Sequence, residues 1–457
     1  MLQDTRATTT VASRATIAHS GLRLEPGIPI CQTDLPLDWY QEELKPYAEE
    51  YLALPDRTPE TVLPWLDSYA RPALSHFGDS LLLLAHFYMG GEIVKLVERY
   101  GGSVSDSYAL ALQAVRRPEK KVIVESAVHF MAEAIAILAN DDQEVWITNP
   151  KAGCTMELLA KDHLVMPIAD QLLERYGDEL VVIAYMNTSG RLKALAGRTG
   201  GAVCTSSNAH LVLEWARAQG KKILFVPDQH LGRNTARRIG MDDSRLLTLP
   251  DPQTYAGGYA LDDGTIAGGV RALDQAEMIL WASHCSVHTV FRPEMVHWWR
   301  DRGWRVLVHP ESTLEVVLAA DGSGSTNYLW NEVMSAPRGA KLAIGTEGHF
   351  VRNARAEGRK RGVEVAHLAD IPELGRGAAG CGCATMSRND PPHLAGMLDL
   401  LRRGEAPDLN RVLAGDSVDE ITGARDRLSP EERRELIRHA KAALERMIEI
   451  TETDRQH

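Results

Sequence analysis

The sequence predicts an α/β protein built on parallel sheets, and three observations lead to that prediction. Short runs of apolar and β-branched residues alternate with longer stretches of helical periodicity. The short runs are apolar on both faces, as expected of strands buried between covering helices. The 457 residues also exceed the roughly 250–300 that one hydrophobic core usually holds, so we expect more than one compact unit.

The expected strands and helices alternate along the chain. The strands are expected at residues 81–85, 121–124, 180–184, 222–226, 305–308 and 341–344. The clearest helical stretches are residues 91–100, 130–138, 208–218 and 351–361. Because a connection between parallel strands is normally a right-handed crossover, these helices are expected to cover the sheets.

Three of the expected strands end in similar sequences, which suggests an internal repeat. The strand ends are the polar–X–polar triplets His86-Phe87-Tyr88, Tyr185-Met186-Asn187 and His309-Pro310-Glu311. Each is followed by a hydroxyl before a helical stretch and then by a cysteine in a later loop. We therefore predict three αβα units at 75–180, 181–304 and 305–402, an N-terminal extension at 1–74 and a helical tail at 403–457. If a pseudo-threefold axis relates the units, their loops meet at one centre.

Charge and composition exclude several classes of function. The formal net charge of −12 offers no basic surplus for binding nucleic acid or an anionic membrane. No apolar run approaches the ~20 residues that span a bilayer. Six cysteines in so long a chain do not resemble a secreted disulfide scaffold, so a reduced, cytoplasmic setting fits best.

Several cysteines occupy loop-like segments with small or polar neighbours. These are Cys154, Cys285, Cys381 and Cys383. Cys204, in contrast, lies in an apolar, strand-like segment and is expected to be structural. Three thiolates from separate loops can hold zinc or an iron–sulfur cluster. There is no local Cys-x-x-Cys spacing, so the spacing alone leaves open whether these cysteines bind a metal or none.

The polar triplets are candidates for ligand binding, because α/β proteins bind ligands at the carboxyl ends of parallel strands. Their side chains are His86, Tyr88, Tyr185, Asn187, His309 and Glu311. The hydroxyls before helical stretches are Ser107, Ser206, Ser325 and Thr326. Such residues cap helices, and the same position binds phosphate or carboxylate through free N–H groups. For Asp228, Glu347, Glu125 and His129 we expect supporting or turn roles.

Local strings spread over residues 80–403 resemble one known family. They include Ala152-Gly153-Cys154, Tyr185-Met186-Asn187-Thr188-Ser189, Cys204-Thr205-Ser206-Ser207-Asn208-Ala209, Cys285-Ser286-Val287-His288, His309-Pro310-Glu311 and Cys383-Ala384-Thr385-Met386-Ser387-Arg388-Asn389. In this order they resemble quinolinate synthase, the iron–sulfur enzyme of de novo NAD biosynthesis. The resemblance implies three related αβα domains with parallel sheets around a pseudo-threefold axis.

The resemblance also implies a cofactor and a reaction. Its motifs place one [4Fe–4S] cluster on Cys154, Cys285 and Cys383, with Cys381 as the close competitor. The fourth iron then has an open position and acts as a Lewis acid. The family condenses iminoaspartate with dihydroxyacetone phosphate to quinolinate, with loss of phosphate and two waters. L-aspartate oxidase is the transient partner that would supply iminoaspartate.

Residue roles follow from the same resemblance. Glu311 matches the family's base. Tyr88 and His86 match the pair of residues that transfers a proton and orients the substrate. The implied substrate-binding residues are His86, Ser107, Tyr185, Asn187, Ser206, His288, His309, Glu311, Ser325 and Thr326.

Two other functions are compatible with parts of the sequence. One is a zinc enzyme that acts on a sugar phosphate, with the three thiolates plus His309 or His288 as ligands. The other is an iron–sulfur sensor or anion-binding regulator. The sensor is disfavoured because the chain is acidic and has no obvious recognition helix.

Overall fold

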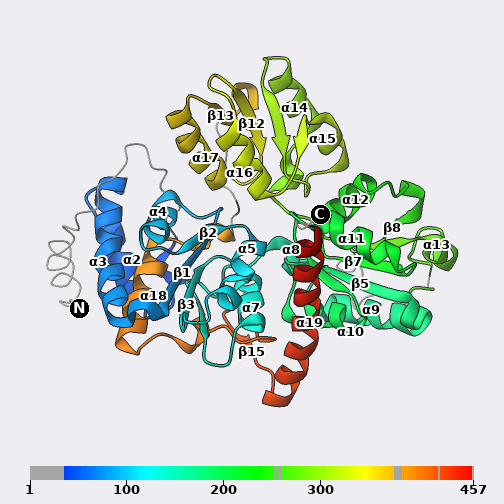
Figure 1. Cartoon of the computed structure of the whole chain (residues 1–457), viewed down its shortest axis with the longest axis horizontal. Coiled ribbons are helices and arrows are strands. Elements are labelled where there is room, and N and C mark those ends of the chain that lie inside the picture. Colours follow the sequence, from blue (N-terminus) through cyan, green and yellow to red (C-terminus); the bar gives the residue numbers. More distant parts are fainter. Residues whose placement is uncertain are drawn as a thin grey trace, which may run out of the picture.

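The computed structural model describes residues 35–251, 254, 259–262, 264–374, 383, 385–419 and 422–454. The described strands form three parallel sheets and one short antiparallel hairpin (Figure 1). Helices flank the sheets, so the predicted α/β class is confirmed. Among the described residues, no helix is both long and apolar enough to cross a membrane.

The first sheet has the strand order β2-β1-β3-β4, with all neighbours parallel. Its strands are β1 (Leu81–His86), β2 (Ser103–Ser105), β3 (Val122–Ser126) and β4 (Glu144–Ile147). The helices between them are α4 (Gly91–Arg99), α5 (Ser107–Ala111), α6 (Gln113–Arg116) and α7 (His129–Leu138). Every residue of β1 is buried, as its continuous apolar sequence predicts.

The second sheet has the order β6-β5-β7-β9-β8 and is also parallel. Its strands are β5 (Leu180–Tyr185), β6 (Ala202–Cys204), β7 (Lys222–Val226), β8 (Leu246–Thr248) and β9 (Met278–Leu280). Helices α8 (Thr155–Leu158) and α9 (Asp162–Tyr176) lead into it. The helices within it are α10 (Gly190–Arg198), α11 (Ala209–Ala218), α12 (Gln229–Arg238) and α13 (Gly269–Gln275).

The third sheet has the order β11-β10-β12-β13. Its strands are β10 (Arg305–Val308), β11 (Gly322–Ser323), β12 (Lys341–Gly345) and β13 (Glu364–His367). Its helices are α14 (Pro293–Arg300), α15 (Leu314–Ala319), α16 (Thr326–Ser335) and α17 (Gly348–Arg361).

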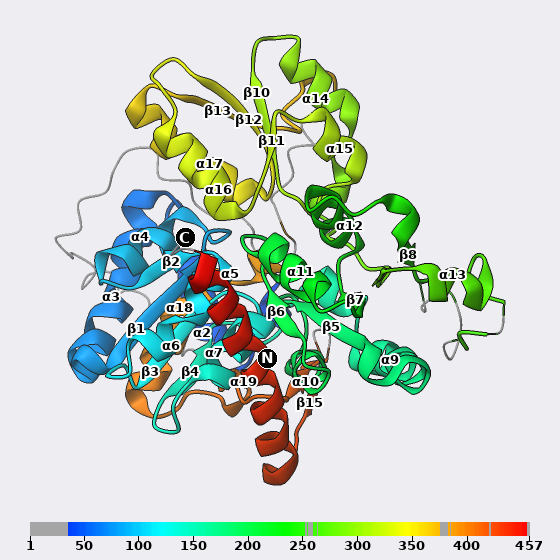
Figure 2. The ribbon, with the colours of Figure 1, turned by 45° about the vertical axis from the view of Figure 1, so that its right-hand side comes forward.

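The three sheets share one topology. In each, the first strand in sequence (β1, β5 or β10) lies between the second and the third. The second sheet adds an edge strand, β8, at the start of its longest connection. The sheets surround a common centre (Figures 1 and 2), as expected of related units around a pseudo-threefold axis.

The segments outside the sheets pack against the first two units. Helices α2 (Lys45–Leu52) and α3 (Pro59–Phe77) contact α18 (Pro391–Arg403), and Figure 1 shows α18 beside them. Our sequence-based boundaries assign α18 to the third unit, and those boundaries stay a prediction. The hairpin β14–β15 (Ser417–Val418 and Arg425–Asp426) precedes α19 (Pro430–Asp454), which packs on α10.

Candidate active site

One cavity lies where loops of all three units meet, and most of the predicted site residues line it. From the predicted set these are His86, Tyr88, Ser107, Cys154, Tyr185, Asn187, Ser206, Cys285, His288, His309, Glu311, Thr326 and Cys383. The strands β1, β5 and β10 deliver the triplet side chains from their carboxyl ends. Residues more than 200 positions apart therefore face the same space.

Ser325 is the predicted substrate-binding residue that is not in this lining. Its hydroxyl accepts a hydrogen bond from Tyr328 N at 3.3 Å and caps α16, so the adjacent Thr326 faces the cavity. The same division occurs at α5. There Asp106 accepts from Ala109 N at 3.0 Å, and Ser107 is left to line the cavity. At both helices one residue caps the helix and the next is available to a ligand.

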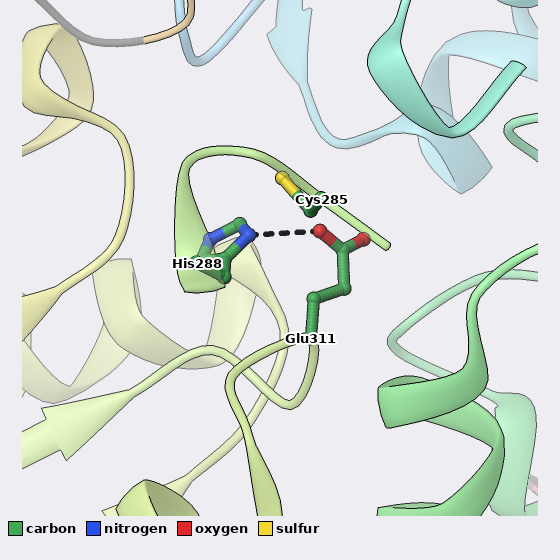
Figure 3. A group of neighbouring side chains, drawn as sticks. All are labelled: Cys285, His288 and Glu311. Atoms are coloured by element: carbon green, nitrogen blue, oxygen red, sulfur yellow. Dashed lines mark ion pairs between the residues drawn. The ribbon is translucent and has the colours of Figure 1, made fainter. Parts of the chain in front are cut away.

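Glu311 is the centre of a buried polar network. Tyr185 donates its hydroxyl proton to Glu311 Oε1 over 2.5 Å. His288 Nδ1 lies 2.8 Å from Glu311 Oε2, as Figure 3 shows, and His309 Nδ1 lies 3.8 Å from the same oxygen. The two imidazole rings stack with their centroids 4.5 Å apart. The network thus joins the carboxyl end of β5 to two loops of the chain that follow β9 and β10.

The surroundings of these groups set their charges. Burial acts to raise the pKa of Glu311, but His309, His288 and the Tyr185 hydroxyl outweigh it and lower that pKa. Burial lowers the pKa of His309 to about 3 and that of His86 to about 4. At neutral pH the site therefore holds an ionised Glu311 together with His309 and His86, both as neutral imidazoles.

Thr346 connects the first unit to the second. Its hydroxyl lies 3.1 Å from Tyr88 Oη and 3.1 Å from His288 Nε2, and its side chain is fully buried. We did not predict it as a site residue. It directly follows β12, so the rule that identified the triplets could have identified it as well. Burial raises the pKa of Tyr88, so this phenol keeps its proton at neutral pH.

His86 is held by its own strand end. Tyr88 N donates to His86 Nδ1 at 3.2 Å, and the two rings pack edge to face. A neutral imidazole that accepts at Nδ1 carries its proton on Nε2. His86 therefore presents an N–H donor, and Tyr88 an O–H donor, from the same end of β1.

Three thiols line the same cavity from three loops. Cys154 precedes α8, Cys285 precedes His288, and Cys383 follows the third sheet. Burial raises the pKa of all three thiols. Cys204, the last residue of β6, is fully buried outside the lining, and Cys381 lies outside the described residues.

Two polar side chains contact these sulfurs. Asn187 Nδ2 donates to Cys154 Sγ at 3.8 Å, and Thr385 Oγ1 lies 3.1 Å from Cys383 Sγ. Glu347 supports the same loop, because its Oε1 accepts from Cys383 N at 3.2 Å. Thr385 was missed by sequence reasoning, since a single threonine two residues after a cysteine carries no recognisable signal.

The metal-binding capacity of the site depends on the spacing of its donors. Within the described part of the chain, ligand atoms of Cys285, His288 and Glu311 all lie within 4.8 Å of one another (Figure 3). They could therefore hold a single metal ion. The three cysteine sulfurs do not form so tight a group among the described residues. Two thiolates on one zinc ion are at most about 4.6 Å apart, twice the ~2.3 Å Zn–S bond.

Comparisons with known proteins all point to one family. Residues 74–422 match the family described as Quinolinate synthetase A protein. The quinolinate synthase of Streptomyces coelicolor is 38% identical over 422 residues, which cover 92% of this chain and 96% of that relative. The quinolinate synthase of Corynebacterium glutamicum is 36% identical over 83% of this chain and 86% of its own length. That of Acidobacterium capsulatum is 36% identical over 88% and 95%.

These matches cover most of both chains and all three sheets. The chain belongs to the quinolinate synthase family of NAD-biosynthetic enzymes.

Proposed function

We propose that this enzyme condenses iminoaspartate with dihydroxyacetone phosphate to quinolinate, with loss of phosphate and two waters. It does so with a [4Fe–4S] cluster held by Cys154, Cys285 and Cys383. The observation that carries the proposal is one cavity lined by three thiols from three loops and by an ionised, buried Glu311.

The donor set fits a cluster better than a single ion. Three thiols face the cavity, and their sulfurs are spread more widely than the ligands of one metal ion. A cluster offers each thiolate its own iron, so wider spacing is expected. When bound through three cysteines, such a cluster supplies Lewis-acid chemistry at its remaining iron.

The protein's own groups supply the proton transfers. Loss of water requires a base that removes a proton and an acid that protonates the departing oxygen. Glu311 is the base, because its carboxylate is ionised and held by Tyr185. Tyr88 keeps its proton at neutral pH and is the acid, and Thr346 fixes the position of its hydroxyl.

The cavity also suits anionic substrates. Iminoaspartate carries carboxylates and the triose carries a phosphate. Ser107, Ser206 and Thr326 line the cavity at or near the starts of three helices, where backbone N–H groups and the helix dipole favour anions. The same proposal includes the substrate-binding roles of Asn187, His288 and His309.

The cellular setting belongs to this proposal as well. The described cysteines, Cys154, Cys204, Cys285 and Cys383, are free thiols, which suits a reducing cytoplasm. Transient contact with L-aspartate oxidase would supply iminoaspartate.

The proposal is tested on protein purified without oxygen, by measuring iron, sulfide and quinolinate formed. Wild type is compared with Cys154→Ser, Cys285→Ser and Cys383→Ser, and Cys204→Ser is the matched control outside the cavity. We expect about four irons per chain in wild type and in the control, as for one [4Fe–4S] cluster. Each of the three cavity variants should lose iron and quinolinate formation together.

Two results would contradict the cluster. Colourless wild type with one zinc per chain would favour a zinc enzyme that uses Cys285, His288 and Glu311. Loss of iron in Cys204→Ser, with the fold intact, would show that the ligand assignment is wrong.

A further inference from the structure

The C-terminal helix α19 contacts the loop that carries Ser206 into the cavity. Near the end of α19, Thr451 Oγ1 accepts a hydrogen bond from Asn208 Nδ2 at 2.9 Å. Thr451 is 5% exposed and Asn208 is 1% exposed, so the bond is shielded from water. We propose that Thr451 is a positioning residue, which holds the Ser206 loop in its substrate-binding shape through Asn208. The kinetic part of this inference depends on the proposed function; the structural part does not.

Asn208 determines the shape of the loop. Its Oδ1 accepts from Thr205 N at 2.6 Å and lies 3.1 Å from Thr205 Oγ1. Thr205 Oγ1 is in turn 2.7 Å from Ser207 Oγ, and Asn208 N donates to Thr205 O at 3.1 Å. Residues 205–208 thus form a turn closed by the Asn208 side chain, with Ser206 inside it. Thr205 and Ser206 line the cavity.

Thr451 fixes which way the Asn208 amide faces. The Thr451 hydroxyl donates its own proton to Met447 O at 2.6 Å, so toward Asn208 it acts only as an acceptor. An acceptor selects the NH₂ end of the amide, which leaves Oδ1 facing Thr205. The reversed amide would set NH₂ against the Thr205 N–H, donor against donor. Thr451 therefore selects the one orientation that closes the turn.

The helix that carries Thr451 is packed closely enough to be a rigid support. Figure 2 shows α19 running past α10. A Cβ added to Gly197 of α10 would lie 1.9 Å from His439 O, so only glycine permits this approach. Further along α19, Arg446 donates to Gly201 O, just before β6. The backbone approach at Gly197 and the side-chain hydrogen bond from Arg446 therefore fix α19 on the second unit before it reaches Asn208.

Hydrogen exchange of the Thr205 amide tests the structural part without any assay of activity. The variants are Thr451→Val, Thr451→Ser and the control Thr453→Val. Thr453 is exposed on the same helix and donates to Glu449 O at 2.8 Å, as Thr451 does to Met447. Exchange at Thr205 should rise about threefold to tenfold in Thr451→Val, the range for one buried hydrogen bond. It should stay at the wild-type rate in Thr451→Ser and Thr453→Val.

Kinetics test the link to substrate. Ser206→Ala first identifies which substrate is bound at this loop, as the one whose KM rises. Thr451→Val should raise the KM of that same substrate about threefold to tenfold and leave kcat within about twofold. In the Ser206→Ala background, Thr451→Val should have no further effect on this KM, because both substitutions remove the same contact with substrate.

The outcomes separate the two proposals. Unchanged Thr205 exchange in Thr451→Val, or KM effects that add in the double variant, would overturn the positioning role. Wild type that forms no quinolinate would overturn the proposed function, and the exchange data would still decide the role of Thr451.

Discussion

Two buried glutamates, Glu311 and Glu125, show how differently this protein treats the same side chain. Glu311 is 3% exposed and follows β10, and Glu125 is 0% exposed and lies near the end of β3. Glu311 contacts Tyr185 and His288. Neither carboxyl oxygen of Glu125 has a hydrogen-bond partner in the described part of the chain. The pKa of Glu311 is lowered, whereas burial raises that of Glu125 to about 8.

The difference teaches that polar partners decide whether a buried carboxyl is ionised. Burial acts to raise the pKa of both carboxyls. Glu311 lies where loops of different units converge, so polar groups from outside its own sheet reach it. Glu125 lies within the first sheet, where its backbone neighbours are Leu84 and Ile147. One carboxyl is therefore available as a base, and the other is a neutral group inside the fold.

The largest expected effect comes from removing the charge at Glu311. Glu311→Gln keeps the shape but cannot take a proton, so kcat should fall about 10²- to 10⁴-fold, the usual contribution of a general base. Quinolinate formation is measured at equal iron content. Glu125→Gln is the matched control and should retain kcat within about twofold. Equal losses in both variants would contradict the distinction between the two carboxyls.

The second largest expected effect is on the free energy of unfolding, and it comes from replacing Glu125. Its pKa is raised from 4.5 to about 8 in the folded protein. The protonated Glu125 carboxyl therefore makes its full contribution to the free energy of unfolding below pH 4.5. This contribution is lost as the pH rises through 8. Glu125→Gln should match wild type near pH 4, below both pKa values. Near pH 8 it should be more stable by on the order of 3 kcal/mol. Urea unfolding at both pH values measures this, and a pH-independent difference would refute it.

The smallest expected effect is on kcat and comes from replacing Thr346, whose hydroxyl lies between Tyr88 and His288. Thr346→Val removes the hydroxyl between Tyr88 and His288, and kcat should fall about tenfold, as expected for loss of one or two neutral hydrogen bonds. KM should change little, because neither bond is expected to hold substrate. Thr346→Ser keeps the hydroxyl and should restore kcat. Failure of serine to restore it would mean that the methyl group matters instead.

Much of the fold could be predicted from sequence. The six expected strands correspond to β1, β3, β5, β7, β10 and β12, which are apolar on both faces and therefore conspicuous. The edge strands β2, β6 and β11 have only two or three residues, too few to show a period. The packing of α18 against α3 could not be predicted from chain order, because an apolar helix can cover any of the three sheets.

Site residues could be predicted from the sequence where a motif occurs three times, but not where a residue occurs once. The polar triplets and the hydroxyls before helices occur three times, and the structure brings all but Ser325 to one cavity. Thr346 and Thr385 occur once each. The charge of Glu311 could not be predicted from its own segment, because it depends on Tyr185 and His288, which come from the second unit.

The most direct test of the difference in charge between Glu311 and Glu125 is an infrared measurement of the two carboxyls at neutral pH. Difference spectra are recorded between wild type and each of Glu311→Gln and Glu125→Gln, on protein with ¹³C-labelled glutamate. We predict that Glu311→Gln removes an ionised carboxylate band and that Glu125→Gln removes a protonated carboxyl band. A protonated band assigned to Glu311 would contradict its proposed role as the base.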